Sequence, residues 1–236
     1  MPQGLYYYIE KTARGKENLN NINYDRIMDE EIKKIVAEGR KPSLLLHACC
    51  APCSSAVLER VADYFNVYIF YYNPNITPKS EYDARVNEVK KLLKLEPCAV
   101  STKLIEGKYD PERFLSIAKG REEMPEGGER CYDCYELRLR ESAKKAAECG
   151  FEYFSTTLSI SPYKHSSWLN EIGGRAAEEY GVRYLFSDFK KKNGYRRSIE
   201  LSEEYGLYRQ NYCGCYCSKA ERERKLTEKD CSAKES

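Results

Sequence analysis

A short apolar run followed at once by three cysteines constrains this chain more than any other feature. Residues 43–47 read Ser-Leu-Leu-Leu-His, and residues 48–53 read Ala-Cys-Cys-Ala-Pro-Cys. A continuous apolar run of this length is typical of a strand buried on both faces of a parallel sheet. Proline is favoured in the first turn of a helix, so Pro52 predicts that a helix begins here. We therefore expect strand–turn–helix units, with thiols at this turn.

The rest of the chain repeats the alternation of strand and helix patterns. This alternation predicts an α/β fold with a doubly wound, Rossmann-like parallel sheet. We expect a single domain over residues 1–236, with a peripheral N-terminal segment at 1–24 and a flexible tail at 225–236. Helices are predicted at 25–39, from 52 onward, and at 79–95, 130–149 and 165–180. Strands are predicted at 43–47, 67–72, 98–102, 152–158 and 182–186.

The predicted topology gathers three segments at one edge of the sheet. In doubly wound sheets, ligands bind beyond the carboxyl ends of the strands. Residues 47–53, 156–163 and 187–188 each follow a predicted strand. We expect these segments to line one cleft, with the first cysteine cluster at its wall.

The net charge and the first residues of the chain limit the classes of function that we consider. The 39 basic and 37 acidic side chains give a net charge of +2, so an RNA-binding surface must be a local patch. The basic run at 190–197 is the candidate, although a solvated loop is its simplest interpretation. Residues 1–11 lack the apolar core of a signal peptide, and no run is apolar for long enough to span a membrane. We expect a cytoplasmic protein.

Eleven cysteines are many for a protein of this kind, and most of them are clustered. An odd number in a reducing compartment argues against a disulfide framework and favours metal ligands or redox thiols. The first cluster is Cys49, Cys50 and Cys53, where the positive end of a helix dipole favours thiolates. A single cysteine is most often a small buried apolar residue, but three within five positions at a turn are hard to explain as packing.

Two further clusters accompany the first. Cys131 and Cys134 lie one helical turn apart, close enough to hold one metal or cluster. Cys213, Cys215 and Cys217 surround Gly214, which gives the backbone freedom between two thiols. Thiolate pairs suit zinc and iron–sulfur clusters alike, and the Cys-Gly-Cys pair favours redox chemistry because zinc carries no electrons. Cys98 and Cys149 are predicted to lie in the core, and Cys231 in the tail.

At these cysteines the sequence resembles a known family, the epoxyqueuosine reductases of the QueH type. The resemblance extends from about residue 44 to residue 218, and four stretches carry it: LLLHACCAPCSS (44–55), ERCYDCYELRL (129–139), FSTTLSISPYKH (154–165) and YRQNYCGCYCS (208–218). It implies a fold akin to the adenine-nucleotide α-hydrolases. Their phosphate-binding loop is replaced here by Ala-Cys-Cys-Ala-Pro-Cys, which argues against the use of ATP.

The resemblance also implies an activity and a set of site residues. The family is an oxidoreductase that reduces epoxyqueuosine to queuosine at the wobble position of tRNA, without cobalamin and with an external electron donor. By position, Cys49, Cys50, Cys131 and Cys134 would ligate a [4Fe–4S] cluster. Cys213 and Cys215 would form a redox-active, catalytic disulfide pair. An additional iron ion is implied as well, and Cys53 and Asp188 are its candidate ligands.

Two other functions fit parts of the pattern. One is an ATP-dependent tRNA-modifying enzyme on the same fold, which tight ATP binding would reveal. The other is a non-enzymatic, zinc-stabilised RNA-binding module, which would be colourless where an iron–sulfur protein is brown. The sequence identifies neither the physiological reductant, nor the tRNA contacts, nor the oligomeric state.

Overall fold

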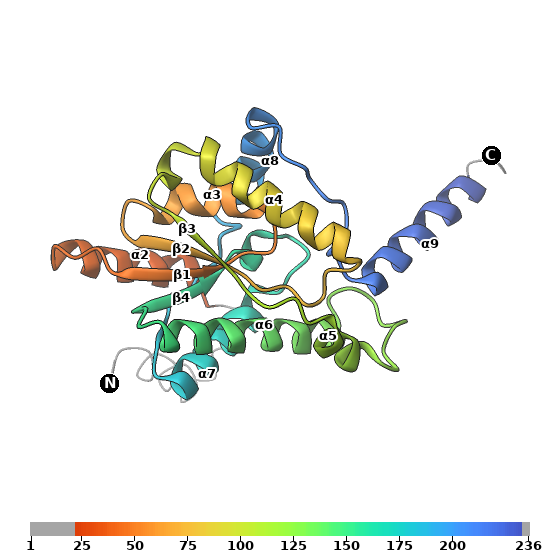
Figure 1. Cartoon of the computed structure of the whole chain (residues 1–236), viewed down its shortest axis with the longest axis horizontal. Coiled ribbons are helices and arrows are strands. Elements are labelled where there is room, and N and C mark those ends of the chain that lie inside the picture. Colours follow the sequence, from red (N-terminus) through yellow and green to blue (C-terminus); the bar gives the residue numbers. More distant parts are fainter. Residues whose placement is uncertain (1–21, 233–236) are drawn as a thin grey trace.

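The computed structural model describes residues 22–232, and their side chains as far as residue 227. A five-stranded sheet with the order β3-β2-β1-β4-β5 forms its centre, and every pair of neighbouring strands is parallel. Helices cover both faces of this sheet (Figure 1). The predicted α/β class and the predicted parallel sheet are confirmed. The N-terminal segment at 1–21 lies outside the described residues, and the single-domain assignment stays a prediction.

The central strand β1 is the apolar run at residues 43–47. β1 (Ser43–His47) pairs with β2 (Asn66–Tyr71) on one side and with β4 (Tyr153–Thr156) on the other. Its leucines are fully buried because helices pack on both faces, as a continuous apolar run requires. β3 (Lys103–Glu106) and β5 (Arg183–Tyr184) form the edges.

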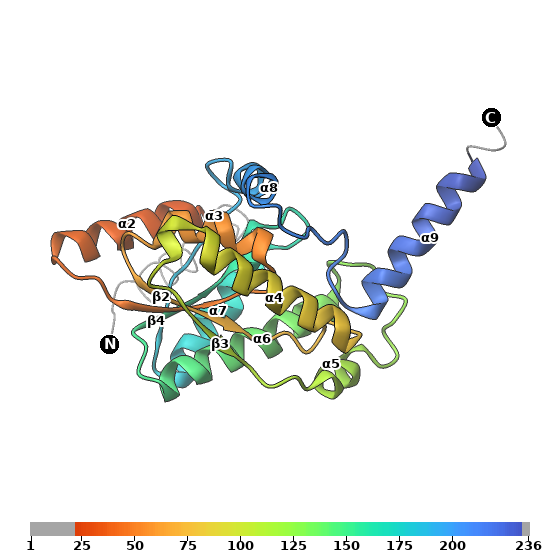
Figure 2. The same cartoon turned by 45° about the horizontal axis from the view of Figure 1, so that its top comes forward.

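Two helical layers enclose the sheet. α3 (Ala51–Val61), α4 (Lys79–Leu95), α8 (Gly194–Glu204) and α2 (Tyr24–Ala37) lie on one face. α6 (Glu129–Glu148) and α7 (Ser166–Tyr180) pack together on the other face, with the short α5 (Pro111–Ala118) at the end of α6. In both views α9 (Tyr216–Ser232) projects from the body (Figures 1 and 2). Among the described residues, every helix is too short or too polar to cross a lipid bilayer.

The predicted strand at 98–102 is wrong. A 3₁₀ turn, η2 (Pro97–Ala99), occupies the start of this range, and the strand forms later, as β3. Proline lacks an amide hydrogen for a strand ladder, so Pro97 favours a turn before the edge strand. Val100, which the prediction placed within the strand, is 86% exposed.

Three helices have no counterpart among the predicted elements: α5, α8 and α9. The predicted basic loop at 190–197 is a short turn that leads into α8 at Gly194. α9 covers residues 225–232 of the range predicted as a flexible tail, and residues 233–236 lie outside the described part. α9 is polar along its whole length, so no amphipathic periodicity marks it in the sequence.

Candidate active site

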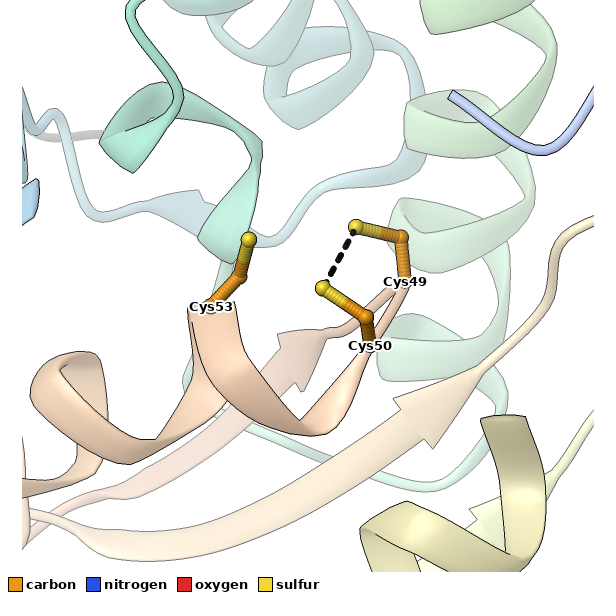
Figure 3. Close-up of side chains that lie close together, drawn as sticks. All are labelled: Cys49, Cys50 and Cys53. Carbon is orange, nitrogen blue, oxygen red and sulfur yellow. Dashed lines mark hydrogen bonds between the residues drawn. The ribbon is translucent and has the colours of Figure 1, made fainter. Parts of the chain in front are cut away.

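Three thiols gather where β1 runs into α3. Cys49 precedes the helix, Cys50 is its N-cap residue, and Cys53 lies in its first turn. The Sγ atoms of Cys49 and Cys50 are 3.8 Å apart, and all three sulfur atoms lie within 4.8 Å of one another. Figure 3 shows Cys49 and Cys50 facing each other and Cys53 projecting beside them. This spacing can hold a metal ion.

Hydrogen bonds among these thiols set their charge states. Bonds from Cys49 and Cys53 hold the pKa of Cys50 well below the usual thiol range. Bonds with Cys49 and Cys50 raise the pKa of Cys53 well above that range. These contacts favour the thiolate form at Cys50 and the protonated form at Cys53. The thiolate is the form that binds metals and reduces substrates.

His47, the last residue of β1, forms hydrogen bonds with both of its ring nitrogens. The ring is fully buried, with Nδ1 2.9 Å from Thr156 Oγ1 and Nε2 3.0 Å from the Tyr72 carbonyl oxygen. A carbonyl only accepts, so Nε2 carries the hydrogen and Nδ1 accepts from the Thr156 hydroxyl. Burial lowers the pKa of His47 to about 4, so the ring is neutral. It fixes the register of β1 against β2 and β4 at the site.

The second predicted cysteine pair lies at the start of α6. Cys131 and Cys134 are buried one turn apart, and Cys131 Sγ accepts a hydrogen bond of 3.3 Å from the Gly127 amide. Cys131 belongs to the same buried cluster as Cys49 and Cys50, so the structure brings these two segments together. Burial raises the pKa of Cys134 to about 12, and the charges of Cys213 and Cys131 also raise it.

The third cysteine cluster packs against the start of α6. Cys215 and Cys217 are buried against Cys134 in one cluster. A hydrogen bond from Cys215 holds the pKa of Cys213 well below the usual range, while that contact raises the pKa of Cys215. Gly214 between them has φ +110°, and a Cβ there would lie 2.9 Å from Ile76 Cγ1. Only glycine adopts this backbone without strain.

Arg138 and Lys164 are two of the buried cations near these thiols, and the sequence did not predict either of them as a site residue. Arg138 is 1% exposed, bonds the Cys134 carbonyl and Asn73, and has no carboxylate partner among the described residues. Its Nη2 is buried without any hydrogen-bond partner. Burial alone would lower the pKa of Arg138, but the charges of Cys134 and Cys213 outweigh it. Nothing in the sequence distinguishes Arg138 from the other bases of α6, because its burial depends on the tertiary fold.

The second cation, Lys164, follows the 3₁₀ turn η3 (Thr157–Ile160) beyond β4. Its side chain is 9% exposed, and its Nζ lies 3.9 Å from Glu126 Oε1. Burial lowers the pKa of Lys164, but the charges of Cys213 and Tyr135 outweigh this effect and raise it. Glu126 also accepts a hydrogen bond of 2.8 Å from Ser218 Oγ, and Ser218 in turn accepts from the Cys213 amide at 3.2 Å.

A cavity of about 860 Å³ joins these groups. Two predicted cleft segments contribute to its wall, through Cys49, Pro52 and Cys53 after β1 and through residues 161–163 after β4. Arg138, Lys164, Glu126 and Cys213 line it as well. The cavity therefore brings thiols from two clusters, two buried cations and a carboxylate into one space at the carboxyl edge of the sheet.

Other predicted residues lie elsewhere or have other partners. Asp188 makes an ion pair of 3.0 Å with Lys190 and accepts from Ser166 Oγ at 3.3 Å. The group of mutually close ligand atoms found among the described residues consists of Cys49, Cys50 and Cys53, and contains neither Asp188 nor Cys131 and Cys134. Cys98 is half-buried beside Glu96. The prediction of a buried Cys149 is wrong, because this residue caps the C-terminus of α6 and is exposed. The side chain of Cys231 lies outside the described residues.

The basic run at 190–197 carries little free charge. Carboxylates neutralise four of its bases: Lys190 pairs with Asp188, Lys192 with Asp29, Arg196 with Glu200 and Arg197 with Glu59. These pairs lie on or next to α8, and their partners come partly from α2 and α3. The run is therefore a helix-packing surface as much as a basic patch.

Fold and site together define a class: an α/β protein with a thiol-lined metal site at the carboxyl edge of a parallel sheet. The family model described as epoxyqueuosine reductase QueH matches residues 44–221. The chain belongs to this family, as its motifs predict.

Curated relatives of the same name are similar in sequence to this chain over most of their length. The epoxyqueuosine reductase QueH of Streptococcus pyogenes serotype M1 is 43% identical over 196 residues, which cover 82% of this chain and 77% of that protein. The protein of the same name from Staphylococcus epidermidis is 43% identical, with 82% and 83% covered. That from Thermotoga maritima is 38% identical, with 79% and 95% covered.

Proposed function

We propose that this protein reduces epoxyqueuosine to queuosine in tRNA, using an iron–sulfur cluster and an external electron donor. Membership of the QueH family supports the reaction. The single structural observation that carries the proposal is one cavity in which thiols meet the buried guanidinium of Arg138, which has no carboxylate partner among the described residues. Such a cavity suits an anionic redox centre next to a substrate that gains electrons.

The proposed cluster ligands are Cys49, Cys50, Cys131 and Cys134. Their donor set fits, because iron–sulfur clusters are held by cysteine thiolates. A buried cation needs a counter-charge, and the orphaned Nη2 of Arg138 would find one in a cluster held by thiolates. When bound, such a cluster supplies electrons one at a time. Cys53, next to the first pair, is the candidate ligand for an additional iron ion.

The reaction must remove the epoxide oxygen as water. Both carbon–oxygen bonds break, a carbon–carbon double bond forms, and two electrons and two protons are consumed. Cys213 and Cys215 can balance this step, since forming a disulfide from two thiols releases two electrons and two protons. The external donor then reduces the disulfide again. A ring this short is strained, and strained disulfides are the easily reduced kind.

Glu126 is the proposed proton donor, and Lys164 is the proposed charge stabiliser. Glu126 lies beside Ser218 and Lys164 at the cavity wall, and burial, followed by the charge of Cys213, raises the pKa of this carboxyl. A carboxyl with a raised pKa holds its proton closer to neutral pH and can act as a general acid. Lys164 would hold the developing negative charge of the epoxide oxygen until protons arrive.

The reaction is tested with the anaerobically purified, iron-loaded protein, a strong reductant and tRNA that carries epoxyqueuosine. We expect a brown protein with bound iron and sulfide, and queuosine in the digested tRNA by mass spectrometry. A colourless zinc protein that leaves the tRNA unchanged would favour the RNA-binding module instead. ATP-dependent turnover would favour the modifying enzyme.

The ligands are tested by replacing Cys49, Cys50, Cys131 and Cys134 singly with Ala. Each change removes a thiolate, so bound iron and the visible absorption of the cluster should fall sharply. Cys149→Ala is the matched control, because this thiol lies at the exposed far end of α6. Iron contents near wild type in all four variants would contradict the assignment.

The redox pair is tested with Cys213→Ser and Cys215→Ser. Each variant should keep its full iron content and lose nearly all steady-state turnover, because the pair supplies electrons without holding the cluster. Peptide mass mapping of the oxidised protein should find the bond between Cys213 and Cys215. Loss of iron would make them ligands, and full activity would show that they take no part. A bond from either residue to Cys217 would change the pairing.

The proton-donor role is tested with Glu126→Gln, which keeps the shape and removes the ionisable carboxyl group. We expect turnover to fall about 10²-fold with iron content unchanged, as is typical for loss of a general acid. Glu123→Gln, on the exposed part of the same loop, is the control. Equal rates in both variants would exclude Glu126 as the donor.

A further inference from the structure

The wall of the cavity also contains exposed side chains that were not among the predicted site residues. Tyr163 comes from the loop before α7, residues 209–212 come from the segment after α8, and Arg222 comes from α9. We call Tyr163, Arg209, Tyr212 and Arg222 the rim. Three separate chain segments thus contribute exposed or half-buried side chains to a cavity that Cys49 and Cys213 line as well.

Basic side chains outnumber acidic side chains in the wall of this cavity. Five bases line it, Arg138, Lys164, Arg209, Arg222 and Lys225, against two acids, Glu126 and Glu221. Arg209 donates only to neutral oxygens, the Ser198 carbonyl at 3.1 Å and the Ser202 hydroxyl at 3.3 Å. Arg222 is exposed and has no ion pair within the described part of the chain. Its neighbour Arg224, in contrast, pairs with Glu123.

The exposed aromatic ring of Tyr163 lines the same cavity as these basic side chains. Tyr163 is 71% exposed, which is unusual for a large ring at a cavity wall. Within residues 22–227, its ring stacks on no other ring and its hydroxyl has no hydrogen-bond partner. Tyr212 on the rim is half-buried with the Arg85 guanidinium over its ring at 5.3 Å. Single-stranded nucleic acids bind surfaces on which free aromatic rings lie next to basic side chains. The nucleobases stack on the rings, and the phosphates pair with the cations.

We propose that the rim binds the anticodon loop of the substrate tRNA. Tyr163 stacks on a base next to the one that enters the cavity, while Arg209 and Arg222 neutralise flanking phosphates. α9 then acts as a side wall that the RNA backbone follows, consistent with its projection from the body (Figure 2). This inference rests on the proposed function and names its substrate contacts. It replaces the basic run at 190–197, whose charges are mostly paired, as the RNA-binding surface.

The test measures binding of an unmodified RNA hairpin with the anticodon stem–loop of a queuosine-type tRNA, by fluorescence anisotropy with the iron-loaded protein. Tyr163→Ala should raise Kd about tenfold through loss of stacking, and Tyr163→Phe should bind as the wild type does. Arg222→Gln should weaken binding and reduce the slope of log K against log salt by about 0.7 to 1, the effect of one lost phosphate contact.

Matched controls separate these effects from general changes. Tyr208→Ala removes another exposed tyrosine that does not line the cavity. Arg224→Gln makes the same charge change on the same helix, away from the cavity wall. Both should leave Kd and the salt slope near wild type. A double variant, Lys191→Gln with Arg196→Gln, tests the basic run and should have little effect.

The outcomes test the RNA-binding rim and the reductase activity separately. Unchanged binding in Tyr163→Ala and Arg222→Gln, equal losses in their controls, or a larger loss in the Lys191/Arg196 variant would each overturn the inference. If the wild type converts epoxyqueuosine while the rim variants bind normally, the inference fails and the function stands. If the rim variants lose binding but the wild type converts nothing, the function fails and the rim remains an RNA site.

Discussion

The burial of positive charge opposite thiols is the constraint on which the rest of the site depends. A guanidinium taken out of water is stable only with compensating charge or hydrogen bonds. Arg138 reaches the Cys134 carbonyl on its own helix and the Asn73 side chain after β2, and Asn73 donates to the Ala48 carbonyl at 2.8 Å. One buried cation thus joins α6 to the turn between β1 and α3. The two thiol segments are held together by groups that also tune their charge.

A second buried arginine, Arg85, joins the Cys213 segment to α4. Arg85 on α4 pairs with Glu81 at 2.7 Å and donates to the Cys213 carbonyl at 3.2 Å. The Thr77 amide donates to the Gly214 carbonyl at 3.0 Å. The Cys-Gly-Cys turn is therefore bound to the loop between β2 and α4, even though it lies about 140 residues further along the chain. Glycine is required at its centre because Arg85 and Ile76 leave no room for a side chain.

Local patterns predicted elements well where the pattern was strong, and failed where it was weak. β1 and α4 have the predicted bounds, and α6 begins and ends within one residue of them. β3 was misplaced because its four residues alternate too briefly to show a period, and α9 was missed because it has no apolar face. The prediction placed Cys149 in the core because a free cysteine is usually buried. The residue is exposed because it lies at the C-terminal end of α6.

The sequence by itself determined the strand–thiol–helix turn and the parallel sheet that places it at a carboxyl edge. These follow from apolar runs and proline placement, which act over a few neighbouring residues. Only the tertiary structure decided which thiols share a cavity, that Arg138 and Lys164 are the cations beside them, and that the bases at 190–197 are paired while Arg222 has no ion pair among the described residues. Burial and ion pairing depend on contacts between distant segments, and no local pattern in the chain encodes them.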